Sequence, residues 1–323
     1  MVGISSLLNP YGDERDGTRY GHKRPSAPVV VWHITDRCNL RCRHCYAALP
    51  ASGPPMDREE ALDFIGLLSD LSPPALLMSG GEPLMHPDFF LYLKAAAAAG
   101  LRITVSTNGV LIDDSAAAEI ASFGVPYVGV SVDGVGDVND SFRGMAGAFQ
   151  RALDGIEALA SAGCRVGLRI TLSRPLLPHL ESILALALDL PVSRLCFYHF
   201  VPVGRGALDS GLSPDRGDEI RAVNRIIRWA DSDARSGGKR PAEVLTVGDA
   251  SDGALVYDYL QGQDPVRAAS ARELLLRSAS RGAGGIRSVR WDGVLFPNQF
   301  SWDRPLGEWR DLACLKSRGT TVE

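Results

Sequence analysis

Short apolar runs alternate with longer segments of helical periodicity along most of this chain, from Val29 to about Val201. The runs are rich in valine, isoleucine and leucine and are bounded by turn-forming residues, which is typical of buried strands. They predict strands that end near residues 35, 79, 106, 132, 172 and 201. The segments between them predict helices over about 57–71, 92–99, 113–123, 146–162 and 178–188. Strands that alternate with helices of this length form parallel sheets.

Local signals mark the ends of two of these helices. Asp57 stands where an N-cap is expected, and Glu60 three residues later completes a capping box. Gly100 follows an alanine-rich run and provides a natural C-terminal cap.

Polar or glycine-rich segments follow the predicted strands. The sequence therefore predicts an α/β fold, a partial (β/α)6 TIM-like barrel with its functional loops at the carboxyl ends of the strands. We expect residues 1–28 to form an N-terminal arm, 29–239 the barrel and 240–323 a small α+β appendage. Residues 214–236 predict a long helix, and residues 285–300 predict a hairpin around Asp292-Gly293, a dipeptide favoured in type I′ turns.

Composition and charge are those of an ordinary folded protein. With 323 residues, 45% hydrophobic and 22% charged, the chain can build a sizeable core. A formal net charge of −4 gives no basic footprint for nucleic acid, and no apolar run is long enough to span a membrane. The first residues lack the pattern of a secretory signal. Six cysteines without such a signal favour a reducing, cytoplasmic location.

Three cysteines are gathered in one loop directly after the first predicted strand. Cys38, Cys42 and Cys45 have the spacing C-x3-C-x2-C. Thiolates bind zinc, Cu(I) and iron–sulfur clusters, and a structural zinc site or an ordinary four-iron cluster takes four protein ligands. Three thiolates on a four-iron cluster leave one iron open for a substrate or cofactor. The alternatives are a zinc site completed by His33 or His44, and a redox-active group of thiols.

Short polar motifs end the next three predicted strands, and they are Gly80-Gly81-Glu82, Ser106-Thr107-Asn108-Gly109 and Ser131-Val132-Asp133-Gly134. Glycines let the backbone approach a ligand closely. The hydroxyl, amide and carboxylate groups can bind ribose hydroxyls or an ammonium group. The alternative for each motif is a role in a turn or a helix cap.

Taken in this order, the motifs resemble the radical S-adenosylmethionine (radical SAM) superfamily, in which three cysteines hold a [4Fe–4S] cluster. The resemblance implies that Cys38, Cys42 and Cys45 hold one such cluster, and that S-adenosylmethionine binds its open iron. It also implies that the glycine loop, polar groups at later strand ends and an aromatic residue beside the adenine bind the cofactor. These cofactor-binding residues are Tyr46, Gly80, Gly81, Glu82, Asn108, Ser131, Asp133 and Arg143.

The chemistry that the resemblance implies is reductive. The reduced cluster passes an electron to the sulfonium, the S–C5′ bond breaks, and a 5′-deoxyadenosyl radical abstracts hydrogen from a small-molecule substrate. An electron donor such as a flavodoxin or a ferredoxin is then a partner. Nucleic acid and membranes are not expected as partners.

Segments of the second half resemble a narrower group, the SPASM/twitch-type enzymes that trim siroheme-derived side chains in haem d1 and alternative haem synthesis. The similar segments are residues 197–206, 246–253 and 296–300. That group usually has C-terminal cysteines for an auxiliary cluster, whereas residues 282–285 and Asn298 occupy the matching region here. The remaining cysteines are widely separated along the chain, and they are Cys164, Cys196 and Cys314. We therefore expect no second cluster, and the appendage is expected to cover the substrate.

Substrate contacts are then expected from ordinary side chains that follow the last strands. His199, Arg205 and Tyr257 are the candidate catalytic residues. Arg205 lies in a glycine-flanked loop that suits a carboxylate clamp. His199 is a proton donor or base, or alternatively a histidine whose partners lie in the core. Further candidates for substrate contact are Asp249, Arg290, Asn298 and Gln299.

The sequence therefore predicts a radical SAM enzyme that acts on a carboxylated small molecule, a tetrapyrrole-like or natural-product intermediate. Hydrogen abstraction would lead to side-chain loss or decarboxylation. The enzymatic alternatives are dehydrogenation or epimerisation of a sugar or aminocyclitol, and modification of a ribosomally made peptide. The non-enzymatic alternative is an iron–sulfur carrier or scaffold.

Overall fold

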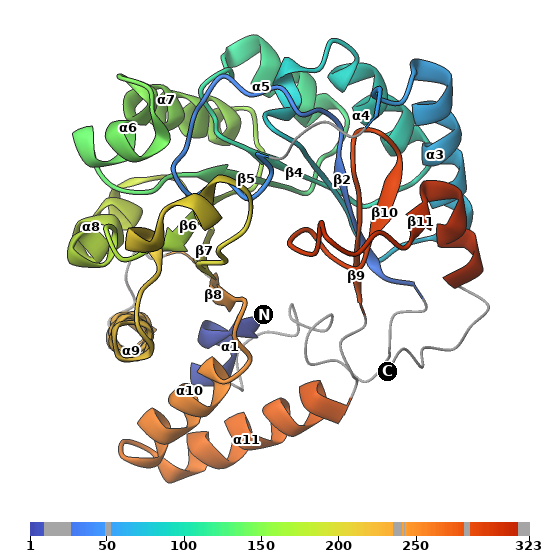
Figure 1. Ribbon diagram of the computed structural model, residues 1–323. Helices are drawn as coiled ribbons and strands as arrows, with labels where there is room; N and C mark the ends of the chain where they lie inside the picture. The colour runs from blue at the N-terminus through green and yellow to red at the C-terminus, as the bar shows by residue number, and fades with distance from the viewer. Residues whose placement is uncertain (10–26, 49–52, 235–240, 242, 281–284, 316–323) are drawn as a thin grey trace.

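The computed structural model describes residues 1–9, 27–48, 53–234, 241, 243–280 and 285–315. Its framework is an 11-stranded sheet in the order β1-β8-β7-β6-β5-β4-β3-β2-β9-β10-β11. The strands are β1 (Val2–Gly3), β2 (Val29–His33), β3 (Leu76–Ser79), β4 (Ile103–Thr107), β5 (Tyr127–Ser131), β6 (Val166–Leu172), β7 (Arg194–His199), β8 (Glu243–Val247), β9 (Ile286–Val289), β10 (Val294–Phe296) and β11 (Gly307–Glu308). Strands β2 to β7 are parallel neighbours, and Figure 1 shows the sheet curving into a partial barrel. The predicted α/β fold is confirmed.

Helices line the convex side of this sheet (Figure 1). The described α-helices are α1 (Ile4–Leu8), α3 (Arg58–Leu71), α4 (Phe89–Ala98), α5 (Asp114–Ser122), α6 (Asp137–Arg143), α7 (Ala148–Ser161), α8 (Leu180–Asp189), α9 (Arg216–Ala234), α10 (Asp252–Gln261) and α11 (Pro265–Ser280). None of them combines the length and apolarity that a membrane crossing requires. The predicted capping box of α3 is confirmed, because the Asp57 side chain accepts a hydrogen bond from the Glu60 amide at 2.9 Å.

Alternate strand residues face opposite sides of the sheet, and the two faces differ in character. Residues of the convex face pack into one large apolar core with the helices. In β2, for example, the Trp32 ring lies 5.2 Å from the Phe64 ring of α3 and 5.3 Å from the Tyr92 ring of α4. The concave face is more polar, and by alternation and register it includes His33, Ser79, Ser106, Ser131, Arg169 and Tyr198. A ligand at this face would therefore meet polar and aromatic groups.

The first residues form regular elements, which differs from the predicted arm. β1 pairs antiparallel with β8, and α1 packs against α9, α10 and α11. Ile4, Leu7 and Leu8 are buried there. So short a segment has too few residues for a periodic pattern, and its apolar side chains are ordered by helices that lie far away along the chain. Residues 10–26 lie outside the described residues.

The C-terminal region extends the sheet at both of its sides. β8 pairs parallel with β7, and β9 pairs parallel with β2. The sheet is thus continuous across residue 240, and the division into domains there stays a prediction.

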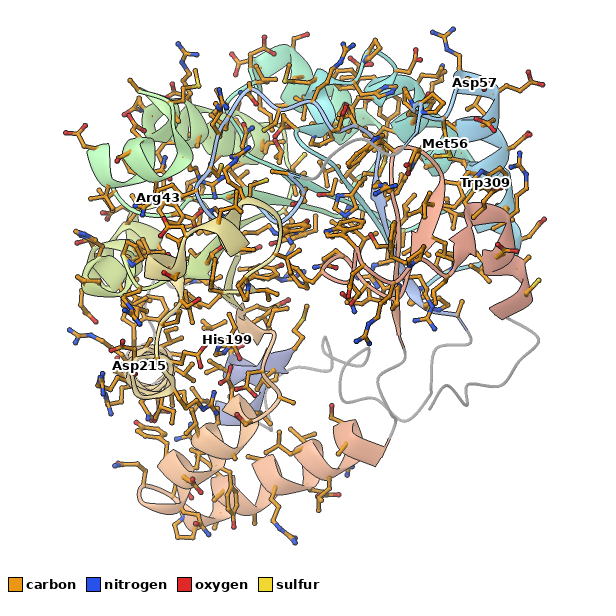
Figure 2. All side chains as sticks on the ribbon, viewed as in Figure 1. Arg43, Met56, Asp57, His199, Asp215 and Trp309 are labelled. Atoms are coloured by element: carbon orange, nitrogen blue, oxygen red, sulfur yellow. The ribbon has the colours of Figure 1, made fainter. Side chains whose placement is uncertain are left out.

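The C-terminal elements also contact the start of α3. Figure 2 shows Met56, Asp57 and Trp309 together there, and the Met56 amide donates to the Trp291 carbonyl at 2.7 Å.

The predicted hairpin near the C-terminus is confirmed, but its turn is not of type I′. β9 and β10 pair antiparallel, with Leu295 opposite Val289. A type I′ turn needs positive φ at two central residues. Among the residues of this turn only Gly293 has a positive φ, of 78°. The loop has three residues, 291–293, because the Arg290 amide donates to the Val294 carbonyl at 3.0 Å and the Gly293 amide donates to the Arg290 carbonyl at 2.9 Å.

Helix α6 was not among the predicted helices, although it positions much of the site. It follows Gly136, whose φ of 58° and lack of a side-chain cap give no helix-start signal in the sequence. It ends at Gly144, with a φ of 72° in the left-handed region. A length of seven residues between two glycines leaves too short a stretch for helical periodicity to show.

Candidate active site

The three-cysteine loop lies at the carboxyl end of β2 and is fixed against the end of α6. The Arg41 and Arg43 amides donate to the carbonyls of Arg143 and Phe142, each at 3.0 Å. Figure 2 shows Arg43 on this side of the molecule, where its guanidinium donates to Asp209 at 2.7 Å. These main-chain bonds hold the loop in place without using any of its sulfur atoms.

The environment of the thiols fits a group that binds thiolates. Cys38 is exposed and Cys42 is buried. Cys38 Sγ accepts from the backbone amide of Leu40 at 3.4 Å. The side-chain nitrogen Nδ2 of Asn108 lies 4.0 Å from the same sulfur. Arg143 Nη1 lies 3.9 Å from Cys42 Sγ. Such donors stabilise negative charge on sulfur, so the residues present fit an iron–sulfur cluster held by three thiolates.

Burial raises the pKa of the Cys42 thiol to about 11, although the nearby Arg143 charge acts in the opposite direction. Without metal this sulfur stays protonated at neutral pH. Metal binding requires the thiolate and therefore releases a proton from Cys42.

The two histidines of the zinc alternative do not lie with the sulfurs. His44 stacks on Phe142 at 4.9 Å, and its Nε2 lies 3.4 Å from Asp133 Oδ2. His33 is fully buried, with its ring 5.8 Å from Tyr46. Burial lowers the pKa of each histidine to about 4. His44 is therefore engaged with Asp133 and Phe142, and His33 packs against the Tyr46 ring.

Asp133 is a buried junction between four parts of the site. Its Oδ2 accepts from Arg143 Nη2 of α6 at 2.5 Å, and its Oδ1 accepts from the Thr171 amide of β6 at 2.8 Å. The Asp133 amide itself donates to Asn139. Burial opposes the charge of Arg143, but Asp133 and Cys42 raise its pKa. Both predicted cofactor-binding residues therefore have protein partners, and their contact with the cofactor stays a prediction.

Glu82 joins the end of β3 to the end of β4. Its carboxylate is 1% exposed and accepts from the Thr107 hydroxyl at 2.7 Å and the Asn108 amide at 2.7 Å. Burial raises the pKa of Glu82 to about 7, against the effect of these hydrogen bonds. The carboxylate thus holds two strand ends in position, and contact with an ammonium group of the cofactor stays a prediction.

Gly80 and Gly81 lie directly against the backbone that leads into the cysteine loop. A Cβ on Gly80 would lie 2.7 Å from the Thr35 carbonyl oxygen, and a Cβ on Gly81 would overlap the Arg37 carbonyl. The Gly81 and Glu82 amides also donate to these two carbonyls, at 2.7 and 2.8 Å. The glycines therefore allow close packing of two loops. Their predicted approach to the cofactor stays a prediction.

We expect Gly81→Ala to displace the cysteine loop and to reduce the iron bound per chain severalfold after anaerobic reconstitution. The added methyl has no space beside the Arg37 backbone, which cannot move aside as a flexible side chain could. Gly66→Ala in α3 is the matched control, because nothing lies within 4 Å of its Cβ. That control should bind iron normally and gain up to about 1 kcal/mol of stability. Equal iron contents in the two variants would contradict this interpretation of Gly81.

Three other predicted cofactor residues lie around the same loop. Asn108 donates to Asn39 of the cysteine loop at 2.7 Å. Ser131 is the last residue of β5 and is half-buried on the concave face. The Tyr46 ring lies 5.1 Å from the Phe300 ring, beyond the β9–β10 hairpin. Of these three residues Asn108 contacts the cysteine loop directly, and the roles of all three in binding remain predictions.

Arg205 is bound to the cysteine loop, which differs from the predicted carboxylate clamp. Its Nη1 donates to the Cys42 carbonyl at 2.6 Å, and its amide donates to the Cys45 carbonyl at 2.9 Å. Gly204, with a φ of 61°, packs so closely that a Cβ would lie 2.6 Å from the Cys45 carbonyl oxygen. No local sequence pattern encodes these distant contacts, and the role of Arg205 toward a substrate carboxylate stays a prediction.

His199 and Tyr257 do not lie on the concave face of the sheet, and their catalytic roles stay predictions. His199 shares the convex face of β7 with Leu195 and Phe197 (Figure 2). Its Nε2 lies 2.8 Å from Asp252 and its Nδ1 lies 3.4 Å from Glu219. Tyr257 is on α10, which packs against α9 and α11, and its hydroxyl accepts from Gln261 at 2.7 Å. The alternative of a core histidine with its own partners is the one that fits His199.

The free energy of unfolding should fall as pH rises through the folded-state pKa of His199. Burial opposes the imidazolium, but Asp252 and Glu219 raise the pKa above its ordinary value of 6.5. A raised histidine pKa gives stability that is fully present below pH 6.5 and is lost above the folded-state value. In His199→Gln this part of the pH dependence should disappear. Urea unfolding between pH 5.5 and 9 measures it, and parallel curves for the two proteins would contradict the assignment.

The other candidate substrate residues are spread over the C-terminal elements. Asp249 pairs with Arg216 at 2.5 Å, and Arg290 pairs with Asp292 at 2.5 Å. Asn298 accepts from the Phe300 amide at 2.8 Å and so caps a turn. Cys164 precedes β6, Cys196 lies in β7 and Cys314 is exposed. Residues 282–284 of the auxiliary-cluster region lie outside the described residues.

Comparison with known proteins agrees with this geometry. A family model for the radical SAM superfamily matches residues 32–185. The chain is 38% identical to Fe-coproporphyrin III synthase of Methanosarcina barkeri, over 97% of this chain and 84% of that protein. It is 33% identical to pre-heme d1 synthase of Dinoroseobacter shibae, over 84% of this chain and 68% of that protein. Streptococcus suis SuiB bound to S-adenosylmethionine has the same fold, with a TM-score of 0.69 at 14% identity over 96% of this chain and 72% of that chain.

The fold and the cysteine loop define a partial-barrel enzyme with an iron–sulfur centre at the carboxyl ends of its strands. More specifically, the chain belongs to the radical SAM superfamily. Enzymes of this family use a [4Fe–4S] cluster and S-adenosylmethionine, so the predicted enzyme class and cofactors are confirmed.

Proposed function

We propose that this enzyme removes or decarboxylates a side chain of a carboxylated tetrapyrrole. The observation that carries the proposal is the 38% identity to Fe-coproporphyrin III synthase along nearly the whole chain. The similarity to pre-heme d1 synthase supports the same substrate class. The polar and aromatic concave face offers suitable surroundings for a flat macrocycle with acidic side chains.

In this proposal the chain's own residues bind the cluster and fix the charged groups beside it. Cys38, Cys42 and Cys45 would hold the cluster, which together with S-adenosylmethionine supplies a carbon radical that abstracts hydrogen from the substrate. Arg143 holds positive charge beside the Cys42 sulfur. Asp133, which follows β5, keeps that guanidinium in place.

An electron donor is required for this chemistry, and a flavodoxin or ferredoxin is proposed for that role. The exposed side chains next to Cys38 include Arg37 and Arg41, which suit an acidic carrier. We place the reaction in the cytoplasm, because its reducing conditions keep free thiols available for a cluster.

The test is anaerobic incubation of the reconstituted enzyme with dithionite, S-adenosylmethionine and either siroheme or iron coproporphyrin III. Mass spectrometry should show loss of a carboxyl or acetic acid side chain from one macrocycle, together with 5′-deoxyadenosine. Formation of 5′-deoxyadenosine without any change in either macrocycle would contradict the tetrapyrrole proposal. It would then favour a sugar, aminocyclitol or peptide substrate.

A further inference from the structure

Arg169 lies on the concave face of the barrel, on strand β6. Its neighbours in register are Ser131 on β5 and Cys196 on β7. The guanidinium lies over the Tyr198 ring, 4.8 Å from its centroid. No sequence motif of the site includes this residue, although an arginine in the middle of an otherwise apolar strand is an unusual signal.

Two glycines provide the space in which this part of the concave face is built. A Cβ on Gly129 would lie 2.7 Å from Arg169 Cδ. A Cβ on Gly167 would overlap the hydroxyl of Tyr127. Both glycines are in ordinary strand positions that any residue can adopt, so the need for them is spatial. The arrangement of Arg169 and Tyr127 therefore requires that Gly129 and Gly167 have no side chains.

Among the described residues, the charge of Arg169 has no carboxylate counter-ion. The neighbouring arginine of β7 behaves differently, since Arg194 lies over the Tyr127 ring at 4.3 Å and also pairs with Glu243 at 2.7 Å. A guanidinium that is mostly removed from water is costly unless an anion pairs with it. Arg169 is thus a largely buried cation without a carboxylate partner among the described residues, which is the kind of group that pairs with an anionic ligand.

A second, independent observation lies beside it. Tyr127 is 8% exposed, and among the described residues its hydroxyl has no hydrogen-bond partner. A buried phenol usually finds a partner. His33, which shares the concave face with Tyr127 and Arg169, has its ring 5.8 Å from the ring of Tyr46, which follows the third cysteine. The unpaired groups therefore lie on the side of the sheet that carries the cysteine loop.

We propose that Arg169 binds a carboxylate of the substrate within the barrel, with Tyr127 and Tyr198 beside it. The proposal rests on the proposed function, and it specifies how an acidic tetrapyrrole would be oriented. One acidic side chain would enter the barrel and pair with the guanidinium. The macrocycle would then lie toward the rings of Tyr46, Phe300 and Trp302, which pack near one another and near His33.

The test compares two probes, iron coproporphyrin III and its tetramethyl ester, which share a macrocycle but differ in charge. Binding to the reconstituted enzyme with S-adenosylmethionine, without reductant, is measured by anaerobic ultrafiltration. The wild type should prefer the acid, and Arg169→Gln should weaken acid binding at least about tenfold while leaving ester binding unchanged. Arg58→Gln on α3 is the control, because its exposed guanidinium pairs with Asp88 outside the barrel. It should bind both probes normally.

Several outcomes would overturn the assignment. An Arg169→Gln variant that keeps the wild-type preference for the acid would refute the role of Arg169 and leave the tetrapyrrole substrate class intact. A parallel loss of affinity for S-adenosylmethionine would assign Arg169 to the cofactor instead. A wild type that binds neither macrocycle would refute the substrate class, and the carboxylate assignment with it. If Arg169→Gln loses its iron, Arg169→Lys decides, since one ammonium should bind the acid severalfold more weakly and the ester equally well.

Discussion

Cys42→Ala should bind little iron after anaerobic reconstitution and should form no 5′-deoxyadenosine from S-adenosylmethionine. The loop offers only Cys38 and Cys45 as the remaining thiol ligands. Cys42 is also the buried member of the three, and Arg143 Nη1 lies 3.9 Å from its sulfur. Removing an outer-shell partner of a metal site typically costs 10–100-fold, so losing a direct ligand should reduce turnover by more than about a hundredfold.

Iron and sulfide analysis together with chromatography of 5′-deoxyadenosine measures both effects. Cys314→Ala is the control, because this exposed cysteine lies outside the loop. It should match the wild type, whose iron content should correspond to a single [4Fe–4S] cluster. Iron for two clusters, lost in part from Cys314→Ala, would contradict the expectation of no auxiliary cluster. An unreactive wild type that binds iron normally would instead favour the carrier or scaffold alternative.

Local patterns were sufficient to predict the barrel and the positions of its loops. Strand and helix periods are visible over a few residues, and each motif directly follows a strand. The capping box of Asp57 and Glu60 is also local, and it is confirmed. Because parallel strands place their carboxyl ends at one edge, the order of the motifs was enough to bring Cys38, Glu82 and Asn108 together.

The partners of the polar groups could not be predicted, because they come from distant parts of the chain. Arg205 binds the Cys42 carbonyl from a loop that follows the last barrel strand. His199 faces away from the site because strand residues alternate, and its neighbour Tyr198 faces inward with Arg169. A shift of one residue along a strand exchanges the two faces. Sequence spacing alone leaves both alternatives for His199 open, because it does not show which face of the strand meets a ligand.

The largest effect on folding is expected from the buried ion pair of Asp133 and Arg143. Asp133 is completely buried and Arg143 is 5% exposed, and their side chains meet at 2.5 Å. Asp133→Asn keeps the shape of the side chain and can still accept from the Thr171 amide. It removes the charge that balances the guanidinium, and breaking a buried pair in this way costs about 3–5 kcal/mol. Anaerobic urea unfolding of the reconstituted protein measures the loss.

An exposed pair of the same loop region provides the matched control. Asp209→Asn breaks the contact with Arg43, in which the side chains are 37% and 47% exposed, and it should cost at most about 1 kcal/mol. The double variant Asp133→Asn/Arg143→Met should recover much of the loss, because it leaves no unpaired buried charge. It should not recover iron binding, since it also removes the donor beside Cys42 Sγ. Recovery of both properties would mean that Arg143 serves only to neutralise Asp133. A single Asp133→Asn variant as stable as Asp209→Asn would show that the pair is not needed for the fold.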